Sequence, residues 1–355
     1  MPVCLDANRT SPDLAEHAIG SDFRKPGSRR LHIGLINNMP DRAMQATERQ
    51  FVKLLDAASP GISVHLSLYA LPDVPRTEWG RSRINHYYSS VESLWDKPLD
   101  GLIVTGTEPA APLLLDEPYW GSLAKALDWA EHNTLSTVWS CLAAHAAVLY
   151  LDGIPRRRLA EKRFGVFECT KASDHLLTKD LPSGLVAPHS RWNDLRESDL
   201  VECGYRMLTR TKDGGVDAFV KQTKSLFVFL QGHPEYEANT LLLEYRRDIG
   251  RYLRHERASY PEVPQGYFDQ NVTEALSVLR DRALANRCED LLADFPLGLL
   301  ENRVKNRWLS TGARLYGNWL RDIGAQKLKR SRQASNTGLV KVKLKKPVAR
   351  SQVQL

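Results

Sequence analysis

Long apolar runs are absent from this 355-residue sequence. No window approaches the roughly 18 consecutive apolar residues that a membrane-spanning helix needs, and residues 1–30 contain no apolar stretch like that of a secretory signal peptide. We therefore expect a cytoplasmic protein without membrane contact. The 42% of hydrophobic and 26% of charged residues are typical of a globular chain with a sizeable buried core.

Cysteine is scarce and irregularly spaced. The five cysteines include no CxxC pair and have no histidine at the spacing of a metal site. This pattern argues against a disulfide framework and against structural zinc. We expect no metal and no bound cofactor.

Acidic residues are missing beyond Asp322, although basic ones continue. The nine basic residues of this region are Lys327, Lys329, Arg330, Arg332, Lys341, Lys343, Lys345, Lys346 and Arg350. Without them the net charge of +7 would be −2, so the body of the protein is slightly acidic. We expect residues 326–355 to form a disordered basic tail. Contact of this tail with nucleic acid is an alternative to a solvated appendage.

The remaining chain divides into three parts. Residues 1–30 are polar and rich in proline, which predicts a mobile N-terminal arm. Residues 31–268 contain all the motifs and form the predicted catalytic domain, and the charged residues 269–325 predict a helical extension that packs on it. We find no internal repeat.

Strands and helices alternate in the predicted domain. Apolar runs at 31–37, 63–71, 99–106, 135–140 and 224–230 predict buried strands, and segments between them have helical spacing. This alternation predicts an α/β fold with a doubly wound, mostly parallel sheet flanked by helices. Ligands of such sheets bind at the carboxyl ends of the strands, so the loops after Gly106 and Ser140 are the places to search.

Cys141 directly follows the strand 135–140 and precedes a small-residue helix start. A side chain on such a turn projects above the sheet, and the N–H groups that follow it can stabilise an oxyanion. The adjacent helix N-terminus favours a thiolate. Position alone also fits a small buried hydrophobic cysteine.

His233 follows another strand end and therefore lies at the same edge of the sheet. Glu235, two residues later, can orient its imidazole, and nucleophile, base and carboxylate together match the pattern of covalent catalysis. The alternative is a simple turn at the start of a helix, with Glu235 stabilised by the helix dipole.

These residues belong to a set of motifs that resembles the homoserine O-succinyltransferase family, relatives of the class I glutamine amidotransferases. The matching blocks include INNMP (36–40), LDGLIVTG (99–106), GIP (153–155), APHSR (187–191), GHPEYE (232–237) and Arg247-Asp248. The resemblance covers about residues 31–268 and again 307–322. It implies a class I glutamine amidotransferase-like fold with a helical C-terminal extension, and a homodimer.

The resemblance also implies roles for individual residues. Cys141 is the expected acyl-thioester nucleophile, His233 the proton acceptor and Glu235 the third member of the triad. The expected reaction is ping-pong: an acyl-CoA, expected to be succinyl-CoA, acylates the cysteine, and the hydroxyl of an amino acid such as L-homoserine then takes the acyl group. Three further positions match substrate-binding residues of the family: Lys162, Ser190 and Arg247.

The sequence departs from the family pattern around the nucleophile. The loop after Gly106 places Ala110 at the position that selects the acyl donor, where a small residue goes with succinyl transfer. Glu108 lies two residues away, and its charge would oppose a succinyl carboxylate and favour acetyl transfer. Leu142, whose backbone N–H is the expected oxyanion donor, and His145 replace an aromatic residue and a glutamine. His145 is either a second proton-handling group or a filler of the helix.

Two other functions fit parts of the sequence. A glutaminase subunit of an amidotransferase shares the fold and the His-x-Glu ending, but here the loop lacks a Gly-Gly pair and no synthetase domain is present. A non-catalytic binding protein would depend on the basic tail. Within the acyltransferase hypothesis, serine or another hydroxy amino acid is an alternative acceptor to homoserine.

Overall fold

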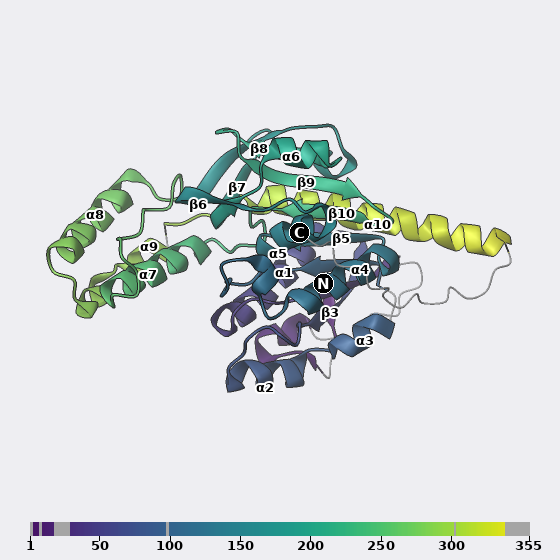
Figure 1. Cartoon of the computed structure of the whole chain (residues 1–355), viewed down its shortest axis with the longest axis horizontal. Coiled ribbons are helices and arrows are strands. Elements are labelled where there is room, and N and C mark those ends of the chain that lie inside the picture. The colour runs from purple at the N-terminus through teal and green to yellow at the C-terminus, as the bar shows by residue number, and fades with distance from the viewer. Residues whose placement is uncertain (1–2, 7–8, 18–28, 97–98, 302, 338–355) are drawn as a thin grey trace.

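A ten-stranded sheet runs through the computed structural model of the chain (Figure 1), which describes residues 3–6, 9–17, 29–96, 99–301 and 303–337. The strands are β1 (Val3–Leu5), β2 (Arg29–Ile36), β3 (Ile62–Tyr69), β4 (Gly101–Val104), β5 (Ser136–Ser140), β6 (Arg157–Lys171), β7 (Val186–Asp194), β8 (Arg206–Thr211), β9 (Val216–Gln222) and β10 (Leu226–Leu230). Their order across the sheet is β1-β3-β2-β4-β5-β10-β9-β8-β6-β7.

The α-helices are α1 (Asp41–Ala58), α2 (Glu78–Tyr87), α3 (Val91–Asp96), α4 (Trp120–Asn133), α5 (Leu142–Asp152), α6 (Glu197–Glu202), α7 (Thr240–Leu253), α8 (Gln270–Ala285), α9 (Leu297–Glu301) and α10 (Leu309–Thr337). Short 3-10 helices are η2 (Pro12–His17), η4 (Leu114–Asp116), η5 (Leu176–Thr178) and η6 (Glu289–Asp294). Within the described ranges, no helix is long and apolar enough to cross a membrane.

The parallel part of the sheet confirms the predicted α/β fold. From β1 to β10 in the sheet order, neighbouring strands run parallel, and the five apolar runs of the sequence form β2, β3, β4, β5 and β10. The remaining strands, from β9 to β7, pair antiparallel and were not predicted. These strands mix buried and exposed residues, as in β6, so they lack the continuous apolar run of a doubly covered strand.

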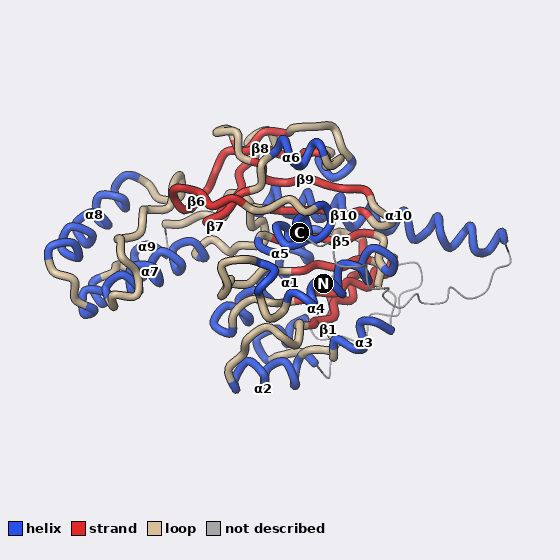
Figure 2. The backbone as a smooth tube through the Cα atoms, viewed as in Figure 1, coloured by secondary structure: helices blue, strands red, loops and turns tan. Residues whose placement is uncertain are grey.

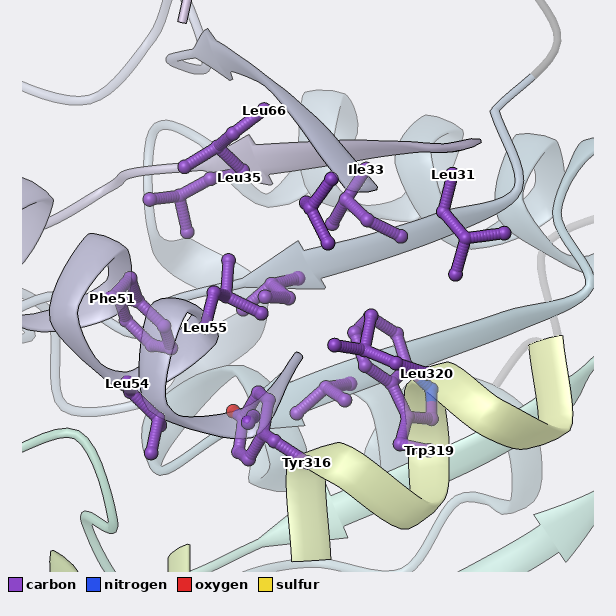
Figure 3. Close-up of a cluster of buried hydrophobic side chains, with 14 of the residues drawn as sticks. Leu31, Ile33, Leu35, Phe51, Leu54, Leu55, Leu66, Tyr316, Trp319 and Leu320 are labelled. Carbon is purple, nitrogen blue, oxygen red and sulfur yellow. The ribbon is translucent and has the colours of Figure 1, made fainter. Parts of the chain in front are cut away.

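Helices cover both faces of the parallel strands (Figure 2). On one face, α1 and α10 pack over a single cluster that includes Ile33, Phe51 and Trp319 (Figure 3). On the other face, α4 and α5 pack over a second cluster that includes Trp129 and Trp139. Strand ends are therefore the parts of the parallel sheet at which a ligand can approach.

The predicted helical extension contains α8, α9 and the start of α10. Residues of α7 and α8 share a third apolar cluster with Trp308, and Figure 1 shows α7, α8 and α9 gathered beyond β6 and β7. The boundaries at 268 and 325 stay predictions. The C-terminal helix is much longer than the sequence suggests, because α10 continues to Thr337.

Parts of both predicted termini differ from the expectation of disorder. In the predicted mobile arm, Val3–Leu5 pairs with β3. Asp56 of α1 accepts a hydrogen bond from Val3 N at 3.0 Å, and it lies 2.8 Å from His17 Nε2. Three apolar residues are too short a run to predict a strand.

In the tail, a helix already packed at Trp319 propagates at low cost through polar residues, and Lys327 pairs with Asp100 at 2.7 Å. Residues 338–355 of the predicted tail lie outside the described residues.

Trp319 provides a test of how α10 is attached. Its side chain is 1% exposed, and its indole Nε1 donates to Ser136 Oγ at 2.8 Å. We expect Trp319→Ala to lower the free energy of unfolding by about 3–5 kcal/mol, because it opens a cavity and removes a buried hydrogen bond. Leu328→Ala, on the same helix but 41% exposed, should change it by less than about 0.5 kcal/mol. Urea unfolding measures both, and equal effects would contradict this packing.

Candidate active site

Cys141 lies in a sharp turn between β5 and α5. All five residues of β5 are buried, and the first residues of α5 are leucine and alanine, so the helix can begin close to the sheet. Cys141 has φ 53° and ψ −113°, a left-handed conformation that costs a non-glycine residue about 1–3 kcal/mol. Its N–H donates to Leu230 O at 2.7 Å. The turn therefore has the geometry of a nucleophile elbow, as predicted.

The structure brings Cys141, His233 and Glu235 together. His233 follows β10, the parallel neighbour of β5, and its N–H donates to Pro188 O at 2.8 Å. The Cys141 side chain lies close enough to the His233 imidazole to raise its pKa, and His233 Nδ1 lies 2.8 Å from Glu235 Oε1. A thiol, an imidazole and a carboxylate thus stand in the order that activates a cysteine nucleophile.

The charge state of this group follows from its burial and its neighbours. Burial by itself lowers the pKa of His233, but the negative charges of Cys141 and Glu235 and their hydrogen bonds raise this pKa well above its usual value. The imidazolium is therefore the favoured form of His233. A positive charge beside a cysteine favours its thiolate, which is the nucleophilic form.

The predicted oxyanion donor, Leu142 N–H, is the first N–H of α5. The first N–H groups of a helix have no partner within the helix, so they can bind an oxyanion beside Cys141. Gly106 passes close by, since a Cβ built on it would lie 2.9 Å from Leu142 N. The loop after β4 therefore closes over this position, and only glycine fits there.

The three predicted substrate-binding residues converge on Glu244, which the sequence analysis missed. Lys162 Nζ and Arg247 Nη2 each lie 3.8 Å from Glu244 Oε2, and Ser190 Oγ donates to the same oxygen. Asp248 balances the cations, at 3.0 Å from Lys162 and 2.8 Å from Arg247. Glu244 and Arg247 are three residues apart on α7 and therefore share a helix face, a signal that could have identified Glu244.

Tyr236 joins this cluster to the triad. Its ring stacks on His233 with ring centroids 4.3 Å apart, and its hydroxyl donates to Glu244 Oε1 at 2.7 Å. A small molecule held by the Glu244 cluster would consequently lie beside the candidate base. Sequence reasoning overlooked Tyr236, although it belongs to the GHPEYE motif.

The loop that was expected to select the acyl donor carries one charge, which is paired. Glu108 forms ion pairs with Arg42 and, at 3.0 Å, with Arg251. Burial alone would raise the pKa of Glu108, but the two arginines hold it below its usual value. Ala110 is exposed, next to Ala111, whose N–H donates to Glu117 at 2.9 Å.

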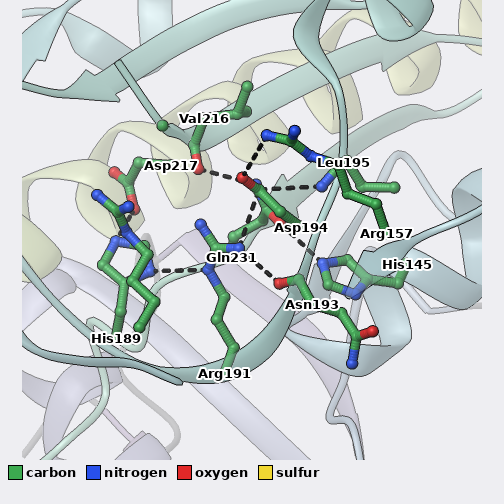
Figure 4. A network of polar contacts seen from close by, with 12 residues as sticks. His145, Arg157, His189, Arg191, Asn193, Asp194, Leu195, Val216, Asp217 and Gln231 are labelled. Atoms are coloured by element: carbon green, nitrogen blue, oxygen red, sulfur yellow. Dashed lines mark hydrogen bonds and ion pairs between the residues drawn. The ribbon is translucent and has the colours of Figure 1, made fainter. Parts of the chain in front are cut away.

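His145 belongs to a buried polar network rather than to the reacting groups (Figure 4). Its Nε2 lies 2.8 Å from Gln231 Oε1, and burial, helped by the charge of Arg191, lowers the pKa of His145 to about 4. The ring is therefore neutral at pH 7. In the part of the chain that the structure describes, no cluster of three or more His, Cys, Asp or Glu could hold a metal ion.

The charge of Glu235 can be tested through the reactivity of Cys141. Glu235→Gln removes a negative charge that raises the pKa of His233, so the imidazolium loses stability and its proton returns to sulfur. We expect alkylation of Cys141 by iodoacetamide at pH 7 to slow by about tenfold, which corresponds to roughly one pKa unit. Glu237→Gln is the matched control, because Glu237 pairs with Arg49 and Lys53. An unchanged rate in Glu235→Gln would contradict the electrostatic role of Glu235.

Solved structures resemble this chain only loosely. A glutamine amidotransferase from Methylobacillus flagellatus aligns over 82% of this chain and 95% of its own, with a TM-score of 0.45 and 13% identity. A glutamine amidotransferase from Thermotoga maritima gives a TM-score of 0.41 and 14% identity, over 78% of this chain and 98% of its own. The family assignment does not depend on these structures.

Sequence comparisons are decisive. A family model described as homoserine O-succinyltransferase matches residues 20–329. A homoserine O-succinyltransferase of Rhodopseudomonas palustris is 47% identical over 89% of this chain and 96% of its own length. That of Bradyrhizobium japonicum is 45% identical over 83% of this chain and 91% of its own. The chain belongs to the homoserine O-succinyltransferase family of acyltransferase enzymes.

Proposed function

We propose that the chain transfers a succinyl group from succinyl-CoA to the hydroxyl of L-homoserine through a thioester on Cys141. The observation that carries the proposal is the series of Cys141, His233 and Glu235 at one edge of the sheet, beside a cluster suited to an amino acid. The product would be an activated amino acid for methionine-type biosynthesis.

Acylation begins with the Cys141 thiolate. It attacks the thioester carbonyl of succinyl-CoA, and the oxyanion that forms is stabilised by Leu142 N–H and its neighbours at the start of α5. The bond from this carbon to the CoA sulfur then breaks, and His233 gives its proton to the departing CoA. The succinyl group remains on Cys141, and His233 is left neutral as a base.

Deacylation uses the same groups in reverse. The hydroxyl of the acceptor gives its proton to His233 while its oxygen attacks the Cys141 thioester. The carbon–sulfur bond breaks, the ester leaves, and the imidazolium–thiolate pair is restored. Loss of one oxyanion donor typically costs on the order of a hundredfold or more in rate.

The cluster around Glu244 has the charges of a site for an amino-acid zwitterion. Arg247 is 34% exposed, and its planar guanidinium suits the α-carboxylate, while Glu244 offers an acceptor to the α-ammonium group. Lys162, only 12% exposed, adds positive charge behind the carboxylate. Because Tyr236 links Glu244 to His233, the acceptor hydroxyl would point toward the base.

The pairing of Glu108 supports succinyl as the acyl group. An unpaired Glu108 carboxylate would repel the free carboxylate of a succinyl chain, but Arg42 and Arg251 neutralise it. Both arginines and Glu108 are partly exposed, so the effect of each pair on binding should be modest. The small side chain of Ala110 leaves space for the longer acyl group.

This interpretation of Glu108 predicts the donor preference of variants. We expect the double variant Arg42→Gln/Arg251→Gln to lose about fivefold more kcat/KM with succinyl-CoA than with acetyl-CoA, because Glu108 is then uncompensated. Adding Glu108→Gln should restore the preference. Arg282→Gln, which breaks a comparably exposed pair with Asp294, is the control. If adding Glu108→Gln does not restore the preference for succinyl-CoA, the arginines do not act through Glu108.

Turnover assays test the proposed reaction as a whole. CoA release should be fast with succinyl-CoA and homoserine together, and mass spectrometry should identify the O-succinyl ester. Acetyl-CoA and serine serve as the competing donor and acceptor. Faster turnover with acetyl-CoA or with serine would identify that compound as the substrate instead. Glutamine hydrolysis without CoA release would contradict acyl transfer.

A further inference from the structure

We propose that Gln231 is a positioning residue, which keeps Cys141 and His233 in register through its side-chain bond to His145. The proposal rests on the proposed function, since it assigns how the reacting pair of that site is held together. Gln231 lies outside the reacting groups, between β10 and His233, and its exposed fraction is 0%.

The backbone around Gln231 is fastened on both sides. On one side, Leu230 O accepts from Cys141 N at 2.7 Å. On the other side, Gln231 N donates to Asp217 O and His233 N donates to Pro188 O, both at 2.8 Å. Gln231 thus lies at the point where the segment of the candidate base meets that of the nucleophile.

The orientation of the Gln231 amide is determined by its partners (Figure 4). Its Nε2 donates to Val216 O at 2.8 Å and to Asp194 Oδ1 at 3.2 Å. Both partners are acceptors, and Asp194 keeps its negative charge beside Arg191, at 2.9 Å. A reversed amide would place its oxygen against a carbonyl and a carboxylate, so Oε1 must face His145.

The tautomer of His145 follows from this orientation. Because Gln231 Oε1 can only accept, His145 must donate from Nε2, at 2.8 Å. A ring nitrogen that already donates a proton to a buried amide cannot act as a base. His145 Nε2 is therefore occupied as a donor to Gln231 Oε1 and is not available as a base.

The bond between His145 and Gln231 joins the two halves of the candidate site, which are the turn at Cys141 and the turn at His233. His145 lies one turn after Cys141, and its N–H contacts Cys141 O at 3.3 Å, so α5 carries both residues as one rigid element. The positive φ of Cys141 is a strained conformation that persists only where the surroundings hold it. The side-chain bond is thus a second connection between α5 and the His233 turn, beside the backbone bond from Cys141 N to Leu230 O.

Substitutions at His145 test this role. His145→Leu removes the donor, and the side chain of His145→Asn is too short to bring its donor to Gln231. The amide of His145→Gln places Nε2 near the position of the imidazole Nε2. We expect the first two to lower kcat by about 30- to 100-fold with KM within twofold, since a shift of about 1 Å costs on the order of a hundredfold. His145→Gln should retain kcat within about threefold. Alkylation of Cys141 by iodoacetamide should follow the same order.

Thr137→Val is the matched control. It removes a buried hydroxyl contact, 3.0 Å from Thr134, at the opposite end of β5, so it should change the melting temperature and leave kcat unaltered. If His145→Leu fails to fold, the comparison of His145→Asn with His145→Gln still tests the proposal. The proposal is overturned if His145→Asn is as active as His145→Gln, or if His145→Gln is as impaired as His145→Leu. Absence of acyl transfer by the unaltered protein would contradict the proposed function instead, and the alkylation rates would still test the positioning.

Discussion

One backbone hydrogen bond, from Cys141 N–H to Leu230 O at 2.7 Å, ties the strained turn after β5 to the end of β10. The two strands run parallel and in register, so the residues that follow them, Cys141 and the turn at His233, emerge at the same edge of the sheet. Cys141 lies beside the imidazole, and Leu142, the next residue, begins α5. The candidate site thus depends on how two neighbouring strands end.

Charge complements this geometry at every level of the site. Burial lowers the pKa of His233, but Cys141 and Glu235 raise it well above its usual value. Farther out, Glu244 and Asp248 face the two cations Lys162 and Arg247, and the proposed amino-acid site rests on these charges. In the loop after β4, Glu108 is paired with Arg42 and Arg251.

The sequence was informative where the signal is local. Apolar runs predicted the parallel strands, and parallel strands end at one edge, which is why Cys141, His233 and Glu235 could be placed together. Glu244 was missed because its partners Lys162 and Ser190 lie on the unpredicted strands β6 and β7. The bond between His145 and Gln231 was missed because it joins two side chains 86 residues apart. The length of α10 was also missed, since its polar end is helical only by continuation from a packed segment.

Intact-protein mass spectrometry after incubation with succinyl-CoA, without acceptor, tests the central claim most directly. We expect a mass gain of one succinyl group in the unaltered protein, its disappearance when homoserine is added, and no gain in Cys141→Ala. An acyl adduct that persists in Cys141→Ala, or turnover without any adduct on Cys141, would contradict a thioester at the turn after β5.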